Sequence, residues 1–230
     1  MTEIPVITVD GPSGSGKGTL AARLALALHW HLLDSGALYR AVAWAALTRA
    51  TPLDDGPALA DLARQLDARF DVVDQDNVVV RASGVDVSRQ IRDEAVSVAA
   101  SRVAALPPVR AALLDAQHAF RRAPGLVADG RDMGTVVFPD APLKVFLEAS
   151  AEERARRRYN QLKDKDLGVS LRALLESIRE RDERDRSRAV SPLKPADGAV
   201  VIDSSSLSID AVFEQVWQLA FDRGLTPTNR

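Results

Sequence analysis

Short apolar runs alternate along the chain with longer stretches in which apolar residues recur at helical spacing. Five of the runs predict strands: Ile4–Asp10, His31–Asp34, Leu126–Asp129, Leu143–Glu148 and Ala199–Asp203. The longer stretches predict helices over Gly16–Leu28, Gly36–Leu47, Ala58–Leu66, Arg92–Ala105, Val109–Arg121, Ala151–Leu162, Ser170–Arg188 and Ile209–Arg223. Strands that alternate with helices are typical of βα units. The pattern therefore predicts an α/β fold with a parallel five-stranded sheet flanked by helices.

The segment Phe70–Val87 departs from this alternation. It is rich in valine and contains Asp-Asn and Ser-Gly pairs, which favour turns. These features predict a small antiparallel ribbon between two helices. We therefore expect a single domain over residues 1–230, with residues 52–106 as an inserted subdomain.

Composition narrows the class of protein. The chain is 46% hydrophobic and 27% charged, as is ordinary for a globular domain. It contains no cysteine, which excludes a disulfide framework, a thiolate zinc site and a catalytic thiol. No apolar run approaches the roughly 20 residues of a membrane span, and the first residues lack the basic segment of a secretory signal. We expect a soluble, cytoplasmic protein with no membrane partner.

The charged residues argue against a general nucleic-acid binder, since the formal net charge is −2. The choice of basic residue is uneven, however, with 25 arginines and 5 lysines. Arginine binds phosphates and carboxylates through a planar fork, so this bias is consistent with anionic ligands. A GC-rich genome would produce the same bias, and composition alone leaves both explanations open.

The segment Gly11-Pro12-Ser13-Gly14-Ser15-Gly16-Lys17-Gly18-Thr19 follows the first predicted strand and opens the first predicted helix. This is the setting of a P-loop, in which glycines let backbone amides converge on phosphate oxygens and a lysine reaches the β- and γ-phosphates. The alternative is a glycine-rich turn without a ligand, which does not account for Lys17. The motif predicts binding of a nucleoside triphosphate, with Lys17 as a catalytic residue.

Gly18 stands where most P-loops carry a Ser or Thr that binds Mg²⁺. We therefore expect Mg²⁺ to be held by phosphates and water, with no direct protein ligand, as its hydration chemistry allows. The form GKGT is similar to that of nucleoside monophosphate kinases. This similarity narrows the prediction from nucleotide binding to phosphoryl transfer.

Predicted strands end in an acidic residue followed by a small one at Asp10-Gly11, Asp34-Ser35 and Asp129-Gly130. Ligands of open α/β sheets bind at these carboxyl ends, so an acceptor site is expected there. Ser35 is a candidate ligand residue or a helix N-cap, and the two roles are compatible. Arg40 lies in an otherwise apolar helix, where it either grips an acceptor phosphate or extends its head to solvent.

The segment 129–135, DGRDMGT, follows an apolar strand and places Arg131 and Asp132 just beyond the carboxyl end of that strand. Phosphoryl transfer needs arginines that neutralise two facing phosphate groups and hold them in line, so Arg131 is a second catalytic candidate. A structural turn with a surface ion pair is the alternative.

The helix from Ser170 carries an apolar stripe that becomes charged. Leu171, Leu174, Leu175 and Ile178 follow helical spacing, and the same face continues as Arg181, Asp185 and Arg188. This face either turns from the core into a polar ligand cleft, where the charges pair, or extends past the core into solvent.

The helix from Ala151 contains Arg154, Arg156, Arg157 and Arg158, with Glu152 and Glu153 placed for i,i+4 ion pairs. One interpretation is a solvated surface. The other is a short helical lid over residues 150–168 that closes on ATP and excludes water.

Four stretches together resemble the bacterial cytidylate kinases, a family of P-loop nucleoside monophosphate kinases. They are VDGPSGSGKGT (9–19), LLDSGALYR (32–40), DGRDMGTVVFPDAP (129–142) and RERDERDRSRAVSPL (179–193). The last two are distinctive, whereas the P-loop alone is not. The resemblance covers almost the whole chain and includes the inserted valine-rich ribbon.

The resemblance implies a P-loop nucleoside triphosphate hydrolase fold and transfer of a phosphoryl group from ATP to CMP or dCMP. It implies Mg²⁺ bound with ATP, a monomer, and a monophosphate-binding role for the insert. By family position, cytosine contacts Ser101, Arg110 and Asp132, and the acceptor phosphate contacts Arg40 and Arg131. The sugar contacts correspond to Arg181 and Asp185, with Arg188 nearby. Among the lid arginines, Arg157 is the favoured catalytic candidate.

Three other functions are weighed against this one. A kinase of UMP, AMP or shikimate would share the P-loop and the arginines. A GTP-dependent switch needs an NKxD-type guanine-binding motif, which the chain lacks. A non-catalytic nucleotide-binding adaptor is disfavoured because Lys17 and both arginine clusters are intact.

Overall fold

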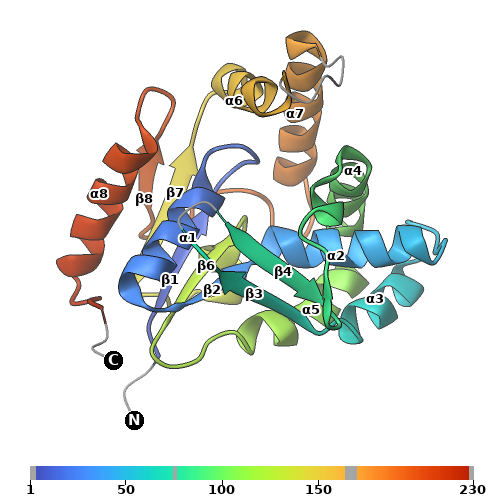
Figure 1. The fold of residues 1–230 in the computed structure, drawn as a ribbon, viewed down its shortest axis with the longest axis horizontal. Helices are drawn as coiled ribbons and strands as arrows, with labels where there is room; N and C mark the ends of the chain where they lie inside the picture. Colours follow the sequence, from blue (N-terminus) through green and yellow to red (C-terminus); the bar gives the residue numbers. More distant parts are fainter. Residues whose placement is uncertain (1–3, 75–76, 164–169, 228–230) are drawn as a thin grey trace.

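The computed structural model describes residues 4–74, 77–163 and 170–227. A five-stranded parallel sheet forms its centre, in the order β2-β6-β1-β7-β8 (Figure 1). The strands are β1 (Val6–Asp10), β2 (His31–Asp34), β6 (Leu126–Gly130), β7 (Leu143–Glu148) and β8 (Val200–Asp203). All five predicted strands therefore form, and the predicted α/β class is confirmed.

Alternate residues of the central strands point into two separate cores. Val6 packs in a core with α2 (Ser35–Thr48), α3 (Gly56–Arg64), α4 (Glu94–Val103) and α5 (Pro107–His118). Ile7 and Val9 pack in the other core with α1 (Lys17–Leu28) and α8 (Ile209–Phe221). Because both faces are covered, β1 and β6 are buried along their whole length, as expected of parallel strands.

A second, antiparallel sheet lies where the sequence predicts a ribbon. It consists of β3 (Ala68–Val72), β4 (Val78–Ala82) and β5 (Val85–Asp86), with Phe70 opposite Val80. The helix predicted to begin at Arg92 begins instead at Glu94, after a 3₁₀ turn over Gln90–Arg92 (η1). Asp93 has an extended backbone between the two, with φ −63° and ψ 144°, and this separates them.

Two helices rise together from the carboxyl edge of the main sheet, at the top of Figure 1. They are α6 (Ala151–Lys163), which follows β7, and α7 (Leu171–Arg186). A single turn of π-helix, η2 (Met133–Val137), follows β6 at the same edge and was not predicted. In the part of the chain that the structure describes, no helix is long and apolar enough to cross a membrane.

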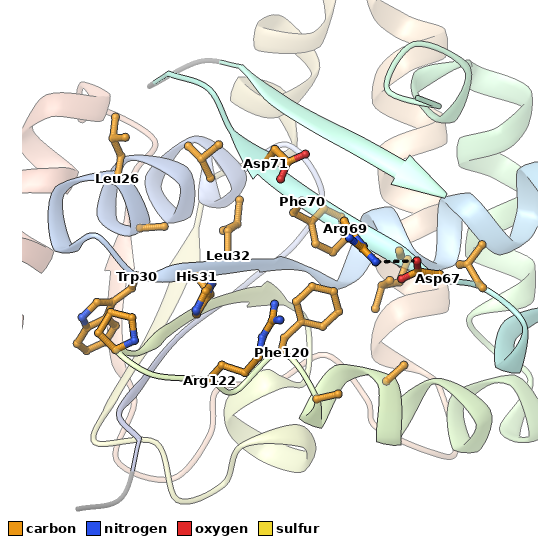
Figure 2. Close-up of a pocket in the computed structure, with 18 of the residues that line it drawn as sticks. Leu26, Trp30, His31, Leu32, Asp67, Arg69, Phe70, Asp71, Phe120 and Arg122 are labelled. Atoms are coloured by element: carbon orange, nitrogen blue, oxygen red, sulfur yellow. Dashed lines mark hydrogen bonds and ion pairs between the residues drawn. The ribbon is translucent and has the colours of Figure 1, made fainter. Parts of the chain in front are cut away.

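A hollow with a volume of about 1120 Å³ lies between β3 and the outer strand β2. Figure 2 shows Trp30, Phe70, Phe120 and Arg122 around it. None of its lining residues belongs to the P-loop or to the segment 129–135. β2 and β3 are the outer strands of their own sheets, and residues of both line this hollow. Among the described residues, the two sheets are not joined by strand pairing.

Trp30 closes one end of this hollow by packing on Gly125, the residue before β6. A Cβ added to Gly125 would lie 2.3 Å from the Trp30 ring. We predict that Gly125→Ala destabilises the protein by about 1–3 kcal/mol, because the buried ring must be displaced. Urea unfolding measures this change.

Gly56→Ala is the matched control. Gly56 is the first residue of α3, and a Cβ there would lie 3.4 Å from Pro108 Cγ, an ordinary contact. We expect no loss of stability in this variant. Equal midpoints for wild type and Gly125→Ala would contradict the prediction.

Candidate functional site

The P-loop residues Gly11–Thr19 connect the carboxyl end of β1 to the start of α1. Gly14 and Gly16 have φ angles of +82° and +96°, in the left-handed region that glycine adopts without strain. Gly16 directly precedes α1, and among the described residues no side chain caps the helix there. The amides of the first turn are thus left for an anionic ligand, which the helix dipole also attracts.

Lys17, the first residue of α1, lies against the end of β6. Its Nζ is 3.8 Å from Asp129 Oδ1 and donates a hydrogen bond to the carbonyl of Pro12 at 3.4 Å. Burial lowers the pKa of Lys17, and the Asp129 carboxylate opposes this shift. Burial raises the pKa of Asp129 to about 6, and Lys17 opposes that shift in turn. Each buried group therefore stabilises the charged form of the other.

A small cavity lies at the same edge, beside the end of β6. Its volume is about 30 Å³, close to that of one water molecule. Its polar lining comes from α2, α4, α5, the loop after β6, and α7 with the segment that follows. The lining residues are Ser35, Gly36, Tyr39, Ala100, Ser101, Ala104, Arg110, Gly130, Arg131, Asp132, Arg181 and Arg188.

Asp185 gathers the arginines on one side of the cavity. Its carboxylate is fully buried, accepts a hydrogen bond from Arg131 Nε at 2.6 Å and pairs with Arg188. Burial opposes its charge, but Arg131 and Arg188 outweigh this effect and lower the pKa of Asp185. Arg181, by contrast, makes no ion pair among the described residues, and burial together with the charge of Arg131 lowers its pKa to about 9.

Arg110 and Asp132 form the opposite wall. They make a buried ion pair, and the Arg110 guanidinium lies over the ring of Tyr39 at 5.7 Å. Ser101 Oγ is buried beside them and has no hydrogen-bond partner among the residues that the structure describes. A buried hydroxyl without a partner destabilises the folded state, and a hydrogen bond to a polar ligand would offset this cost.

Arg40 and Arg131 converge at the start of α2. A Cβ added to Gly36 would lie 3.2 Å from Arg40 Nη1 and 3.9 Å from Arg131 Nη1. Arg40 also pairs with Asp34 at 2.9 Å, so its guanidinium has a carboxylate partner at this end of α2. Asp34, rather than Ser35, caps α2, accepting from the amide of Ala37 at 2.7 Å. Ser35 is buried and accepts a hydrogen bond from Gln117 at 3.5 Å.

The stripe on α7 forms, with one correction. Leu174 is buried, whereas Leu171, the first helical residue, is 45% exposed. The charged half of the stripe is the more buried half, because Asp185 has no exposed surface. This excludes the alternative of a solvated helix end.

The arginines of α6 differ from one another. Arg154 is buried and binds Asp182 of α7. Arg157 donates to the carbonyls of Ser15 at 3.2 Å and Ser204 at 2.6 Å, and thus lies against the P-loop. The other two arginines form more exposed ion pairs, Arg156 with Glu153 and Arg158 with Glu94.

One of the two expected i,i+4 pairs on α6 forms, between Glu153 and Arg157. The other does not, because Glu152 pairs with Arg179 of α7. Residues 164–168 of the expected lid lie outside the described residues.

Sequence reasoning missed the role of two buried carboxylates. Asp182 pairs with Arg154, a partner that only the packing of α6 on α7 could reveal. Asp10 accepts hydrogen bonds from the amides of Met133 and Gly134, both at 2.8 Å, and so fixes the turn after Arg131 and Asp132. The position of Asp10 at a strand end indicated a site residue, but the sequence did not show that its partners are the amides of Met133 and Gly134.

Two anion-binding centres at one sheet edge, a P-loop and an arginine-lined cavity, define a P-loop kinase that works on two phosphorylated substrates. The comparisons with known proteins give the family. The cytidylate kinase family model matches residues 7–221, and the chain belongs to this family.

Relatives at high identity agree with this assignment. A cytidylate kinase of Stutzerimonas stutzeri (strain A1501) is 60% identical over 223 residues, which cover 96% of this chain and 97% of that protein. A cytidylate kinase of Aeromonas hydrophila subsp. hydrophila is 61% identical over 212 residues, covering 92% of each. Among solved structures, an uncharacterized protein from Eubacterium ventriosum matches with a TM-score of 0.52 and 11% identity, covering 95% of this chain and 98% of that one. That likeness shows the fold alone.

The buried Asp10 predicts a pH dependence of stability. Burial raises its pKa to about 7, although the two amide donors oppose the shift. The unfolded carboxyl loses its proton near pH 4, whereas the folded one keeps it until about pH 7. The folded state therefore binds more protons in this interval, and its stability falls as pH rises.

We predict that Asp10→Asn removes this component. Between pH 5 and 7.5 the free energy of unfolding should decline less in Asp10→Asn than in wild type, measured by urea unfolding without nucleotide. Parallel pH profiles for the two proteins would show that Asp10 does not titrate in this way.

Proposed function

We propose that the chain transfers the γ-phosphoryl group of ATP to CMP or dCMP, giving CDP or dCDP and ADP. The family assignment supports a cytidylate acceptor and ATP as donor. The observation that carries the proposal is the convergence of Arg40 and Arg131 at Gly36, which follows β2 and is separated from the P-loop strand β1 by one strand, β6. Two guanidinium groups there suit the phosphate of an acceptor that faces the γ-phosphate.

On the donor side, the amides of Gly11–Thr19 and the start of α1 would hold the ATP phosphates, and Lys17 would reach the β- and γ-phosphates. The acceptor oxygen belongs to a phosphate that is already largely anionic at neutral pH. No strong general base is therefore required. Catalysis would come from alignment and charge neutralisation by Lys17, Arg131 and the lid residue Arg157.

On the acceptor side, Arg40 and Arg131 would bind the phosphate, with Ser35 beside them. The sugar would contact Arg181 and Asp185, with Arg188 close by. Supporting this, the cavity holds an excess of arginines over carboxylates, and Arg181 lacks an ion pair among the described residues.

Ser101, Arg110 and Asp132 would read the base. Cytosine offers acceptors at O2 and N3, which suit the Arg110 guanidinium, and an exocyclic amine donor, which suits the Asp132 carboxylate or the Ser101 hydroxyl. Uracil presents an acceptor in place of that amine and would face the carboxylate unpaired. A mismatch of this kind costs roughly 2–4 kcal/mol.

The cavity, about 30 Å³, is far smaller than a nucleotide. We propose that its walls move apart when the acceptor binds, and that the insert, residues 52–106, and the described part of the lid, helix α6, are the parts that move. Ser101 lies in the insert, and Arg157 lies in the lid.

Mg²⁺ would enter with ATP, held by phosphates and water. Asp129 fits a supporting role, because its Oδ1 is buried, lacks a hydrogen-bond partner in the described part of the chain, and could accept from metal-bound water. The ion would neutralise phosphate charge. We further propose that the protein acts as a cytoplasmic monomer on these small-molecule substrates, without nucleic-acid or membrane partners.

The proposal is tested by acceptor-dependent release of ADP from ATP and Mg²⁺. CMP and dCMP should support turnover, and UMP should be poorer by roughly 30- to 1000-fold in kcat/KM, the equivalent of the mismatch energy. AMP and shikimate should be inactive. Equal use of UMP would overturn the assignment of the base-reading residues, and no acceptor-dependent release would overturn the function.

Asp132→Asn tests the base-reading group directly. An amide side chain can donate to the uracil oxygen, so the preference for CMP over UMP should fall by about tenfold or more. The ratio of the two kcat/KM values measures this. Lys17→Met is the control, because it should lower turnover with both acceptors by about 100- to 1000-fold and leave their ratio unchanged. An unchanged ratio in Asp132→Asn would contradict the proposed role.

A further inference from the structure

Neighbouring residues of helix α7 face two different places, the arginine-lined cavity and helix α6. Arg181 and Asp185 belong to the acceptor cluster, as described above. Asp182, the residue after Arg181, points instead to α6 and is 5% exposed. A change in the position of α7 would therefore move acceptor residues and Asp182 together.

Arg154 of α6 joins Asp182 to the P-loop. Its Nη1 and Nη2 donate to the two oxygens of Asp182 at 3.0 and 2.5 Å. The same Nη1 donates to the carbonyl of Ser13 at 3.1 Å, and Nε donates to the carbonyl of Ala149 at 2.9 Å. Every nitrogen of the guanidinium group is engaged, so its position fixes α7 relative to the donor loop.

The stem of Arg154 also packs on the P-loop. A Cβ added to Gly14 would lie 3.4 Å from the Arg154 Cβ. Arg154 is only 2% exposed, so the pair with Asp182 is shielded from water. Buried ion pairs contribute little net stability, which leaves geometric specificity as the reason for a fully bonded pair at this place.

The same two helices carry a second ion pair that lacks these properties. Arg179 and Glu152 join α7 to α6 at 2.7 Å, but both side chains are more than half exposed. Neither residue has a hydrogen bond to the P-loop among the described contacts. An ion pair between α6 and α7 is therefore not in itself linked to the P-loop.

We propose that Arg154 and Asp182 are positioning residues that couple ATP binding to acceptor binding. Phosphates in the P-loop fix the backbone at Ser13 and Gly14, which holds Arg154. Through Asp182, this orders α7 and places Arg181 and Asp185 for the acceptor. The inference rests on the proposed function, and by linkage each substrate must raise the affinity for the other by the same factor.

The test is calorimetric titration of CMP with and without a non-hydrolysable ATP analogue and Mg²⁺. In wild type the analogue should tighten CMP binding at least about fivefold. In Arg154→Lys, which keeps the charge but loses the fork, and in Asp182→Asn, this factor should fall toward one. Arg179→Lys and Glu152→Gln should keep the wild-type factor. A positioning role also raises the KM for CMP at saturating ATP more than it lowers kcat.

Each outcome decides the question. A purely structural pair would lower the melting temperature of the variants and leave the coupling factor intact, which overturns the proposal. A coupling factor of one in wild type overturns it as well. Should Asp182→Asn fail to fold, Arg154→Lys carries the test. Failure of the proposed function is distinct, because wild type would then show no CMP-dependent release of ADP.

Discussion

The free-energy cost of burying charge is the main physical constraint on the residues at the carboxyl edge of the sheet. A parallel sheet gathers its carboxyl ends at one edge, and here that edge is covered by helices on both faces. Charged groups placed there lose water and remain ionised only beside a partner. Lys17 depends on Asp129 in this way, and Asp185 depends on Arg131.

The strands and the P-loop could be predicted because their signals are local: apolar runs, glycine spacing and one lysine. The charged face of α7 could also be predicted, since helical spacing alone places Asp185 on the same face as the apolar stripe, nearer the end of the helix. The ion-pair partner of a charged side chain, by contrast, depends on how the helices pack and could not be predicted from neighbouring sequence. Glu152 can reach Arg156 on its own helix, yet it binds Arg179, because α7 packs beside α6. Ser101 and Arg110 were assigned only through the family resemblance, since nothing in their surroundings marks them.

The arginines of this chain do several kinds of work. Arg156 and Arg158 form solvated pairs of the kind that contributes little to stability. Arg154 and Arg157 instead use their forked heads to bind backbone carbonyls around the P-loop, which a lysine could satisfy only in part. A genome-wide codon bias and a functional demand can therefore coexist, because only part of the arginine content touches the site.

The small arginine-lined cavity already contains carboxylate partners for its arginines. Asp132 pairs with Arg110, and Asp185 pairs with Arg131 and Arg188, so an anionic ligand that bound there would exchange partners with them. An incoming ligand must offer enough groups to compensate both members of each separated pair. A small anion without hydrogen-bond donors can engage the arginines but offers nothing to the freed carboxylates. A ligand that carries both an anionic group and hydrogen-bond donors would compensate both members of each pair.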